Sequence, residues 1–529
     1  MSDLFEKRPD GASRRQTRLD KEQKDKKKTR IISVSVSIMF ALIFIAALLV
    51  NSKFIRRVLP AVSIDGISFS VAEFDYFFTD TYYNYQQTIN EQLGEYASYM
   101  LPSTEEPLSS QVHDEEAGTT WEDYLTGLAL ENMTDMVKIV NAAKKDPDFE
   151  LSQEAREDID NGIDALRTQA TTYQYPSLDG FLQAAYGNSL NERTMRKIFE
   201  FTELARAYSK HKYDSLTYTQ SEIDAYYSEN KDDLDSLIFR ILLVTAETLD
   251  SEDFDSTEDY DIATEVAKLT AQEHATSIVD QIESGGDDKE EEFIKAALEY
   301  DPVAYADPAT TLIVVSGSNV SEQPYGEWLF DEARSRGDIT TEDIDSGTYV
   351  VCYVDRDSNE YEMTSMRQIL VQPEAVDSTE YDEGEEDPEY IIAVQLARAE
   401  AQARAETVWN LFLDGGATED KLLELMEENS TDTTEGGFYE NITKNMSDSK
   451  MVPEIEDFLF APDRKKGDHE LIETEAYGYH IVFFMGYGER YCDYLATNNL
   501  REKDYQAWSD SLVSGTAVQQ WAVMLRQHR

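Results

Sequence analysis

Residues that serve in ordinary catalytic centres are scarce in this chain. Its 529 residues include two cysteines and six histidines. Cys352 and Cys492 are too few for a disulfide framework, and the sequence leaves open whether they pair; we expect two isolated thiols. HExxH, CxxC and GxSxG motifs are absent from the sequence, which removes the usual signatures of metal hydrolases, dithiol redox enzymes and serine hydrolases. We therefore expect neither a cofactor nor a metal site.

Basic residues are also few. The 47 Lys and Arg residues face 106 Asp and Glu residues, for a formal charge of −59. Because phosphate binding depends on Lys and Arg, we expect no nucleic-acid partner. The imbalance is uneven, since residues 1–30 hold 11 basic and 6 acidic residues and the remainder carries −64. A solvated, aggregation-resistant surface is the expected role of the acidic runs; Ca²⁺ binding is the alternative, although no DxDxDG loop is present.

One long segment lacks charge altogether. IISVSVSIMFALIFIAALLV, from Ile31 to Val50, has 20 residues, enough for a helix to cross a hydrocarbon core of about 30 Å. A cleaved signal peptide is the alternative, but the run is longer than a typical h-region and no small-x-small site follows it. Because the basic tail precedes the span, we expect an uncleaved anchor in the cell membrane, with the N-terminus cytoplasmic and the acidic bulk of the chain outside.

The sequence repeats itself in its second half. Four segments recur in one order at offsets of 127 to 131 residues, which indicates a tandem duplication. The pairs are FRILLV (Phe239–Val244) and MRQILV (Met366–Val371), the glycine pairs Gly285–Gly286 and Gly415–Gly416, WLFDEARSRGD (Trp328–Asp338) and FLFAPDRKKGD (Phe458–Asp468), and SGTYVVCYV (Ser346–Val354) and YGYHIVFFM (Tyr477–Met485).

Both copies follow the same order of predicted elements. A short apolar strand precedes an acidic insertion, whose composition cannot bury enough surface to order itself. A long helix comes next, at about 262–284 in the first copy and 389–413 in the second, and ends at the glycine pair. A second helix, a loop, a short helix and a closing strand complete a compact α+β unit of about 120 residues.

The second copy carries a family resemblance. MRQILV, NSTD, EGGFYENI, MVPEIEDFLF and GYHIVFF follow one another between residues 364 and 488, and together they resemble a parvulin-type peptidyl-prolyl isomerase. The first copy keeps the frame, but Tyr349 stands where the closing-strand histidine belongs, so it resembles a degenerate parvulin domain.

The resemblance implies a site for prolyl isomerisation, which breaks no covalent bond and has a barrier of about 18–20 kcal/mol. Such a site needs an apolar slot for the proline ring and polar groups that favour the twisted amide. The polar set implied is His480, Asp432, Gln368 and Tyr477, and the slot implied is Phe438, Met451, Ile455 and Phe460. Gln368 replaces a family histidine and Ile455 a family aromatic, so the site departs from the family pattern. The alternatives are a structural role for His480 and a plain core role for the four apolar residues.

The region before the repeats resembles the same neighbourhood of families. AVSIDGISFSVAEFDYFF (Ala61–Phe78) and the helical segments after it are similar to the opening of membrane-anchored, SurA/PrsA-like extracytoplasmic foldases of Gram-positive, Firmicutes-like bacteria. The expected α+β architecture is a basic cytoplasmic tail (1–30), a transmembrane anchor (31–50), a SurA-N-like helical chaperone module (61–235), a degenerate parvulin-like domain (237–356), a parvulin-like domain (364–488) and a C-terminal helix that packs on the chaperone module (489–529). An independent amphipathic tail is the alternative for the last segment.

Two functions follow from the resemblance. The first is a foldase that isomerises X-Pro bonds in unfolded or newly secreted polypeptides, and the second is a holdase that binds such chains without catalysis. Tyr349, Gln368 and Ile455 are the departures that favour the second. A structural envelope protein that only retains the fold is a weaker third alternative, and a homodimer stays open.

Overall fold

The computed structural model describes Val34, Val36, Ile38–Phe40, Lys53–Val58 and then residues 60–187, 189–381, 386–444, 451–512 and 519–520. The chain forms two compact units, one from Met1–Leu216 with Lys503–Arg529 and one from Thr217–Glu502. No helix among the described residues is long and apolar enough to cross a membrane. The predicted tail and most of the predicted span at 31–50 lie outside the described residues.

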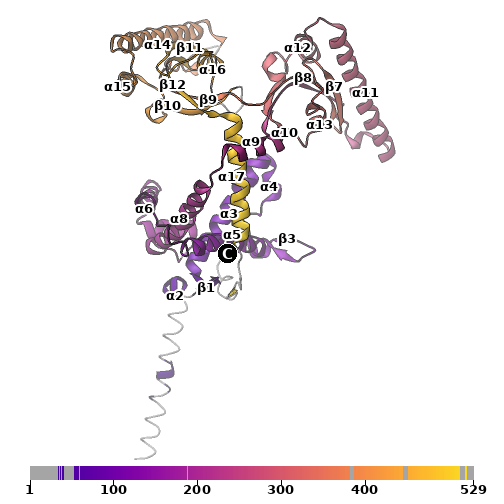
Figure 1. The fold of residues 1–529 in the computed structure, drawn as a ribbon. Helices are drawn as coiled ribbons and strands as arrows, with labels where there is room; N and C mark the ends of the chain where they lie inside the picture. The colour runs from indigo at the N-terminus through magenta and orange to yellow at the C-terminus, as the bar shows by residue number, and fades with distance from the viewer. Residues whose placement is uncertain are drawn as a thin grey trace, which may run out of the picture. The chain divides into compact units, whose positions relative to one another are not determined.

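The first unit is mainly helical (Figure 1). Its strands are β1 (Pro60–Ile64), β2 (Ile67–Ser70), β3 (Val112–Asp114), β4 (Thr119–Thr120) and β13 (Gln519–Gln520). Its helices are α2 (Lys53–Val58), α3 (Val71–Leu93), η1 (Gly94–Tyr96), α4 (Ala97–Met100), η2 (Leu108–Ser110), α5 (Trp121–Ala143), α6 (Gln153–Thr172), α7 (Leu178–Tyr186) and α8 (Glu192–Ser215). One sheet has the order β13-β1-β2, and β3 pairs with β4.

Capping and apolar periodicity explain the long helices of this unit. Ser70 and Glu73 form a capping box at the start of α3, and Thr120 and Asp123 form another at the start of α5. Each box satisfies backbone N–H groups that the first helical turn leaves unpaired. The apolar faces of these helices then meet in one core with β1 and β2. The core residues include Phe74, Leu125, Met133, Ile163, Leu182 and Met195.

The end of the C-terminal helix α17 (Tyr491–Ser511) belongs to the first unit. The Tyr208 and Trp508 rings lie 6.0 Å apart, centroid to centroid, and the Tyr213 and Tyr505 rings lie 5.7 Å apart. These edge-on aromatic pairs join the end of α17 to α8.

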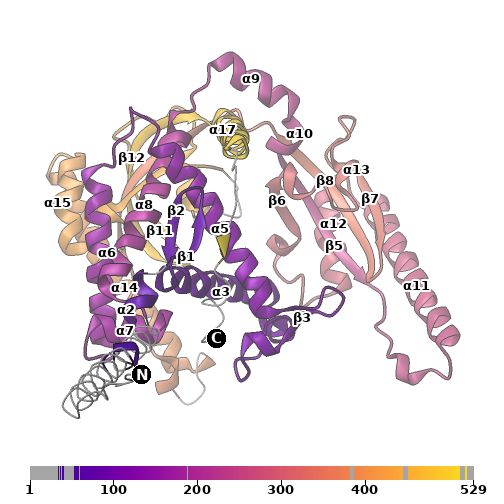
Figure 2. The same cartoon turned by 90° about the horizontal axis from the view of Figure 1, so that it is seen from below.

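The second unit contains two four-stranded antiparallel sheets with the same topology (Figures 1 and 2). Their orders are β6-β5-β8-β7 and β10-β9-β12-β11. The first copy consists of β5 (Ser236–Thr245), η3 (Ser251–Asp253), α11 (Thr257–Ser284), α12 (Lys289–Tyr300), η4 (Pro308–Thr311), β6 (Leu312–Ser316), η5 (Gly317–Asn319), α13 (Gly326–Leu329), β7 (Ile339–Ile344) and β8 (Gly347–Asp357). The second consists of β9 (Glu362–Val371), η6 (Ser378–Glu380), α14 (Pro388–Asp414), α15 (Glu419–Asn429), η8 (Glu435–Gly437), β10 (Phe438–Ile442), α16 (Pro453–Leu459), β11 (His469–Thr474) and β12 (Gly478–Arg490).

The long helices of the two copies bury matching positions. The buried residues 130 positions apart are Ala271 and Ala401, Ala275 and Ala405, Ile278 and Val408, and Ile282 and Phe412. In each copy these residues pack on one face of the sheet, with α12 or α15 beside them. The opposite face of each sheet packs against the short helix α13 or α16. The duplication read from the sequence thus extends to the side-chain packing.

An equivalent Arg–Glu ion pair ties the opening strand of each copy to its second helix. Arg240 Nε lies 2.9 Å from Glu290 Oε1, and Arg367 Nε lies 2.8 Å from Glu419 Oε1. Arg240 is buried and also donates from Nη1 to the Pro308 carbonyl and to Thr311 Oγ1. Its guanidinium charge is therefore compensated and hydrogen-bonded away from water, as a buried charge requires.

Two boundaries differ from those expected. The first unit ends at Leu216 rather than at 235, so α9 (Gln220–Glu229) and α10 (Lys231–Leu234) belong with the repeats. The reason is a set of polar contacts: the Tyr227 hydroxyl hydrogen-bonds to Asp235 and lies 3.0 Å from the Ser358 carbonyl oxygen, and Arg356 pairs with Asp235. Helix α11 begins at Thr257, inside the predicted acidic insertion, because Ser256 accepts a hydrogen bond from the Asp259 N–H as an N-cap.

Replacing Glu290 with Gln should destabilise the second unit by about 3 kcal/mol, because it leaves the buried Arg240 charge without its carboxylate. Urea unfolding of the full-length chain measures this loss. Glu332→Gln is the matched control, since Glu332 pairs with Lys231 at an exposed position and should change stability by less than about 0.5 kcal/mol. Equal effects of the two substitutions would contradict the assigned role of Arg240.

Candidate functional site

The strand register of the second sheet brings two predicted site residues together. β9 and β12 are antiparallel, with His480 opposite Leu370 and Gln368 opposite Val482. Gln368 and His480 are therefore diagonal neighbours on one face, within reach of long side chains. His480 Nδ1 lies 2.8 Å from Gln368 Oε1, and both side chains are buried.

A third predicted residue, Asp432, reaches this pair from the loop after α15. The loop is held to β9 because the Thr431 N–H donates to the Leu370 carbonyl at 2.8 Å and Ser430 Oγ accepts from the Leu370 N–H. Asp432 Oδ2 then lies 2.7 Å from Gln368 Nε2. The structure thus brings together His480, Gln368 and Asp432.

These contacts have a definite direction. An ionised carboxylate only accepts hydrogen bonds, so Gln368 presents its NH₂ to Asp432 and its carbonyl oxygen to His480. His480 must therefore carry its proton on Nδ1, and its Nε2 is left to accept from Thr474 Oγ1, 3.0 Å away. We call Thr474, His480, Gln368 and Asp432 the polar chain, through which hydrogen bonds run from buried Thr474 to half-buried Asp432.

Burial and hydrogen bonding set opposite protonation behaviour at the two ends. Burial lowers the pKa of His480 to about 4, although Asp432 and Glu454 oppose this shift. Burial also acts to raise the pKa of Asp432, but hydrogen bonds from Thr434, Gln368 and Tyr439 outweigh it and hold that pKa below its usual value. At neutral pH the polar chain therefore contains a neutral His480 imidazole, linked through Gln368 to an ionised Asp432 carboxylate.

Tyr439 links the polar chain to an apolar cluster. Its hydroxyl lies 2.9 Å from Asp432 Oδ2 and accepts from Thr434 Oγ1 at 2.9 Å. Its ring packs against a core on the same face of the sheet, together with the partly buried side chains of Met451 and Phe460. The combination gives one patch with a carboxylate, a phenol and apolar groups.

The four predicted slot residues do not all share this patch. Met451 and Phe460 are partly buried in the cluster, whereas Ile455 is 2% exposed and supports it from within. Phe438 pairs with Arg367 in the β9–β10 register and stacks under its guanidinium, 4.8 Å from the ring centroid. Because Arg367 faces α15, Phe438 lies on the opposite face from Gln368, and the prediction for Phe438 is wrong by one residue.

Phe460 contacts Lys444, a residue that the sequence did not indicate as part of the site. The Lys444 ammonium lies 5.3 Å from the Phe460 ring centroid and 4.7 Å from that of Tyr361. The Lys444 N–H also donates to the Tyr361 hydroxyl at 3.0 Å. One edge of the apolar patch is therefore covered by a cation held over two rings.

Tyr477 is not part of the polar chain. Its side chain is 46% exposed, and its ring centroid lies 6.4 Å from that of His480. Its backbone N–H, rather than its hydroxyl, reaches the site by donating to Thr474 Oγ1 at 3.3 Å. The prediction that the Tyr477 hydroxyl joins the network is wrong.

Sequence reasoning missed Tyr439, Thr434 and Thr474. Thr474 lies at the end of β11, where one buried hydroxyl among apolar residues gives no distinctive pattern. Tyr439 adjoins Phe438 in the same motif. Side chains alternate between the two faces of a strand, and Tyr439 pairs with Met366, which is on the same face as Gln368. This alternation is the signal that could have identified Tyr439.

The first copy has no equivalent polar chain. Ile241 stands for Gln368 at an offset of 127 residues, and Tyr349 stands for His480 at an offset of 131. The Tyr349 ring packs edge-on against Tyr325, 5.4 Å between centroids, and both belong to an apolar cluster with Phe239. This face of the first sheet is packed with aromatic and aliphatic groups in place of hydrogen bonds.

The arrangement suits binding and polarisation rather than covalent chemistry. The polar chain holds no nucleophile next to a free base, because the His480 nitrogens are both engaged. Within the described ranges, no group of three or more His, Cys, Asp or Glu side chains is placed to hold a metal. Asp432 and Tyr439 are the polar groups that a bound chain could contact, since both are half-buried.

Comparison with known proteins adds little. No family model matches the chain, and no curated protein matches it. Among solved structures, the chain is similar to PrsA from Bacillus subtilis, with 12% identity over 61% of this chain and 93% of that chain and a TM-score of 0.16. This superposition is too poor to support an argument, so the function is argued from the residues themselves.

The depressed pKa of His480 predicts a pH dependence of stability. Below about pH 6.5 the unfolded chain protonates this histidine, whereas the native state resists protonation until about pH 4. The unfolded state then binds more protons, so the native state loses up to about 3 kcal/mol as the pH falls through this window.

Urea unfolding at several pH values, compared between the native sequence and His480→Gln, isolates this contribution from that of the carboxylates. The variant should lose less stability between about pH 6.5 and pH 4.5. Parallel pH profiles for the two chains would show that His480 is not held neutral.

Proposed function

We propose that this chain is a membrane-anchored extracytoplasmic foldase whose second repeat accelerates cis/trans isomerisation of X-Pro bonds in unfolded or newly secreted polypeptides. The observation that carries the proposal is the contact of Tyr439 with both the Asp432 carboxylate and the apolar cluster that includes Met451 and Phe460. A prolyl peptide needs these two environments side by side: one apolar surface for the pyrrolidine ring and polar groups beside its amide.

The chemistry of the amide explains why a fixed carboxylate helps. Resonance in the planar amide places negative charge on oxygen and positive charge on nitrogen, and twisting the bond removes both. An ionised Asp432 near the amide oxygen destabilises the planar state relative to the twisted one, which lowers the barrier. The polar chain keeps Asp432 ionised and in place, so Gln368, His480 and Thr474 act as positioning residues.

A second candidate function is binding without catalysis, and a separate observation favours it. The first unit exposes large apolar side chains along the second half of α3, η1 and α4. The exposed fractions are 53% for Tyr83, 65% for Tyr96, 85% for Tyr99 and 56% for Met100. Aromatic and Met side chains with one polar or polarisable end suit adaptable binding of unfolded chains. This surface would hold unfolded clients by itself, with no catalytic step at the second repeat.

Isomerisation of a proline tetrapeptide by the full-length chain tests the catalytic proposal. Asp432→Asn should reduce the acceleration about tenfold, since it removes the charge that distinguishes the planar from the twisted amide. Met451→Ala should reduce it as well by removing part of the ring-binding surface. Phe438→Leu is the matched control, because Phe438 lies on the other face of the sheet and should leave the rate unchanged. Full activity of Asp432→Asn would overturn the assignment of the site.

Suppression of client aggregation tests the binding surface. The pair of substitutions Tyr96→Ser and Tyr99→Ser should weaken protection of a reduced, unfolded client by the full-length chain, because it removes exposed aromatic contact area. Tyr173→Ser serves as the control, since Tyr173 is 67% exposed elsewhere in the same unit. Equal protection by all three chains would rule out the α3–α4 surface as the client site.

A further inference from the structure

Both repeats leave apolar side chains in solvent at the same places on their long helices. In α11 no residue before Ala267 is buried, and in α14 none before Ala401 is buried. On these unburied segments, Ile262 and Val266 are 59% and 56% exposed, and Ile392 and Leu396 are 63% and 60% exposed. The members of each pair are four residues apart, so they lie on one side of the helix. We call the two pairs the exposed stripes.

The exposed stripes correspond in sequence. Ile392 follows Ile262 by 130 residues, and Leu396 follows Val266 by 130, the same offset that relates the buried positions of the two helices. The two copies have diverged at the polar chain, where Ile241 replaces Gln368. Both copies nevertheless have apolar residues at the stripe positions, where exposure to solvent would favour polar residues. This agreement is expected if the exposed stripes are covered by a partner.

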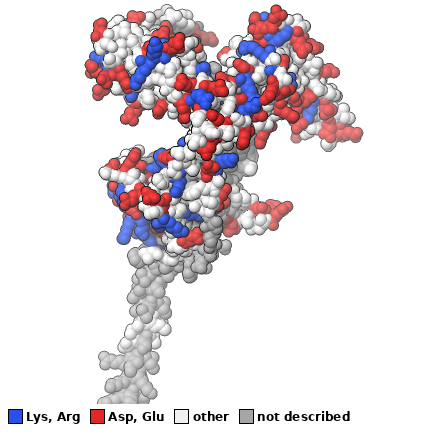
Figure 3. Space-filling view, in the orientation of Figure 1, with Lys and Arg blue, Asp and Glu red and all other residues white. Residues whose placement is uncertain are grey.

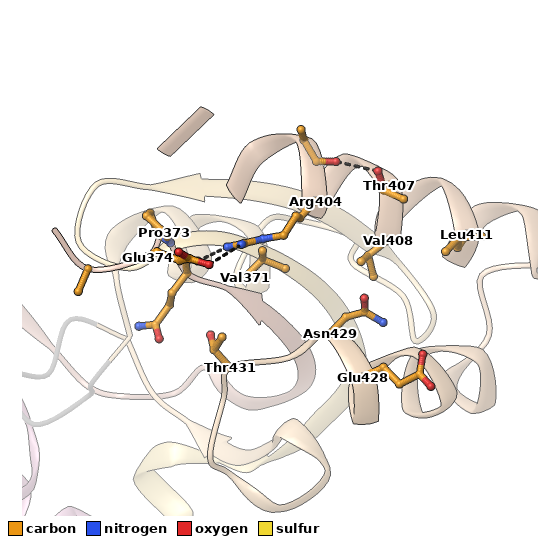
Figure 4. A pocket seen from close by; sticks show the side chains of 13 residues that line it. Val371, Pro373, Glu374, Arg404, Thr407, Val408, Leu411, Glu428, Asn429 and Thr431 are labelled. Carbon is orange, nitrogen blue, oxygen red and sulfur yellow. Dashed lines mark hydrogen bonds and ion pairs between the residues drawn. The ribbon is translucent and has the colours of Figure 1, made fainter. Parts of the chain in front are cut away.

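A groove adjoins the long helix in each copy. In the first, a groove of about 750 Å³ lies between the strand extension Val244–Leu249 and α11, and Val266 of the exposed stripe lines it. In the second, a groove of about 800 Å³ lies between the equivalent extension, Val371–Ala375, and the later part of α14 from Ala403 to Leu411, so it begins seven residues beyond Leu396 of the exposed stripe. Figure 4 shows Arg404 reaching from α14 toward Glu374, and its guanidinium also donates to the Gln372 carbonyl. Grooves of this size suit a few side chains of a bound chain.

The sequence that precedes each stripe is acidic. The residues numbered 247–261 include eight acidic and no basic residues, and so do those numbered 374–387. Figure 3 shows acidic side chains over the end of α11 that extends past its sheet in Figures 1 and 2. A second copy of this chain is a poor occupant, because the net charge of −59 opposes self-association at an acidic face. The complementary partner combines apolar and basic side chains.

We propose that the exposed stripes and their grooves bind extended segments of unfolded polypeptide in which apolar residues alternate with Lys or Arg. The proposal rests on the foldase function above and names its client class. The stripe contributes the apolar contact, and the acidic residues that precede it in the sequence supply the charge selection. The first repeat, which lacks the polar chain, is thereby a client-binding copy of the same frame. Two exposed stripes on one chain also raise the effective concentration of a long client at the catalytic repeat.

Fluorescence anisotropy with the full-length chain and two labelled peptides tests the inference. One peptide alternates Leu and Lys with Gly-Ser spacers, and the other replaces each Lys with Glu. The Leu-Lys peptide should bind more tightly, with an affinity that falls as salt rises. The combined substitution Ile262→Ser, Val266→Ser, Ile392→Ser and Leu396→Ser should weaken its binding about tenfold or more. Val303→Ser is the matched control, since Val303 is 88% exposed outside the stripes, and should leave the Kd unchanged.

Three outcomes would overturn the inference. In the first, the fourfold variant binds the Leu-Lys peptide as tightly as the native sequence does. In the second, the Leu-Glu peptide binds as tightly as the Leu-Lys peptide. In the third, the fourfold variant keeps its peptide binding and instead loses self-association in sedimentation. Tetrapeptide isomerisation, measured on the same preparations, separates this inference from the proposed catalysis. Stripe-dependent binding without isomerisation removes only the catalytic proposal, whereas normal isomerisation with stripe-independent binding removes only the inference.

Discussion

The second repeat depends on one constraint, that a buried imidazole must have a hydrogen-bond partner on each nitrogen. His480 cannot reach water, so Thr474 and Gln368 must satisfy it. Because the ionised Asp432 carboxylate only accepts hydrogen bonds, Gln368 must offer its amide hydrogens to Asp432 and its carbonyl oxygen to His480, which places the imidazole proton on Nδ1. The negative charge of the polar chain therefore lies at Asp432, its half-buried end. His480, which stays neutral near pH 7, thus holds Gln368 in the orientation that donates to the ionised Asp432 carboxylate.

Comparison of the two copies distinguishes the residues that maintain the fold from those that form the polar chain. Both copies keep the same strand order, the same buried helix positions and the ion pair between the opening strand and the second helix. The face that carries the polar chain in one copy is packed with Tyr349 and Tyr325 in the other. An apolar repacking of this kind is favourable, because it removes the need to satisfy buried polar groups. Retention of the frame after loss of the polar chain is consistent with a binding role for the first copy.

The sequence predicted much of this arrangement, and the failures have local causes. Repetition and apolar periodicity were enough to place the opening strand, the closing strand and the helices of both copies, and the family resemblance was enough to bring Gln368, Asp432 and His480 together. The other strands, β6, β7, β10 and β11, were not predicted, because they are short and mostly only partly buried. Phe438 failed because a one-residue change of position along a strand moves a side chain to the other face. Thr474 could not be found, since a single buried hydroxyl has no sequence signature. The start of α11 depends on a Ser cap inside an acidic run, where composition suggested no structure.

The most direct test is an NMR titration of the His480 imidazole nitrogens in the full-length chain. The account predicts a neutral ring with its proton on Nδ1 at pH 7 and no protonation until the pH approaches about 4. Protonation near the ordinary histidine value, or a neutral ring with its proton on Nε2, would contradict it. A proton on Nε2 alone would reverse the direction of the polar chain and leave Asp432 without the amide donor that holds it in place, whereas an imidazolium at neutral pH would show that burial does not keep His480 neutral.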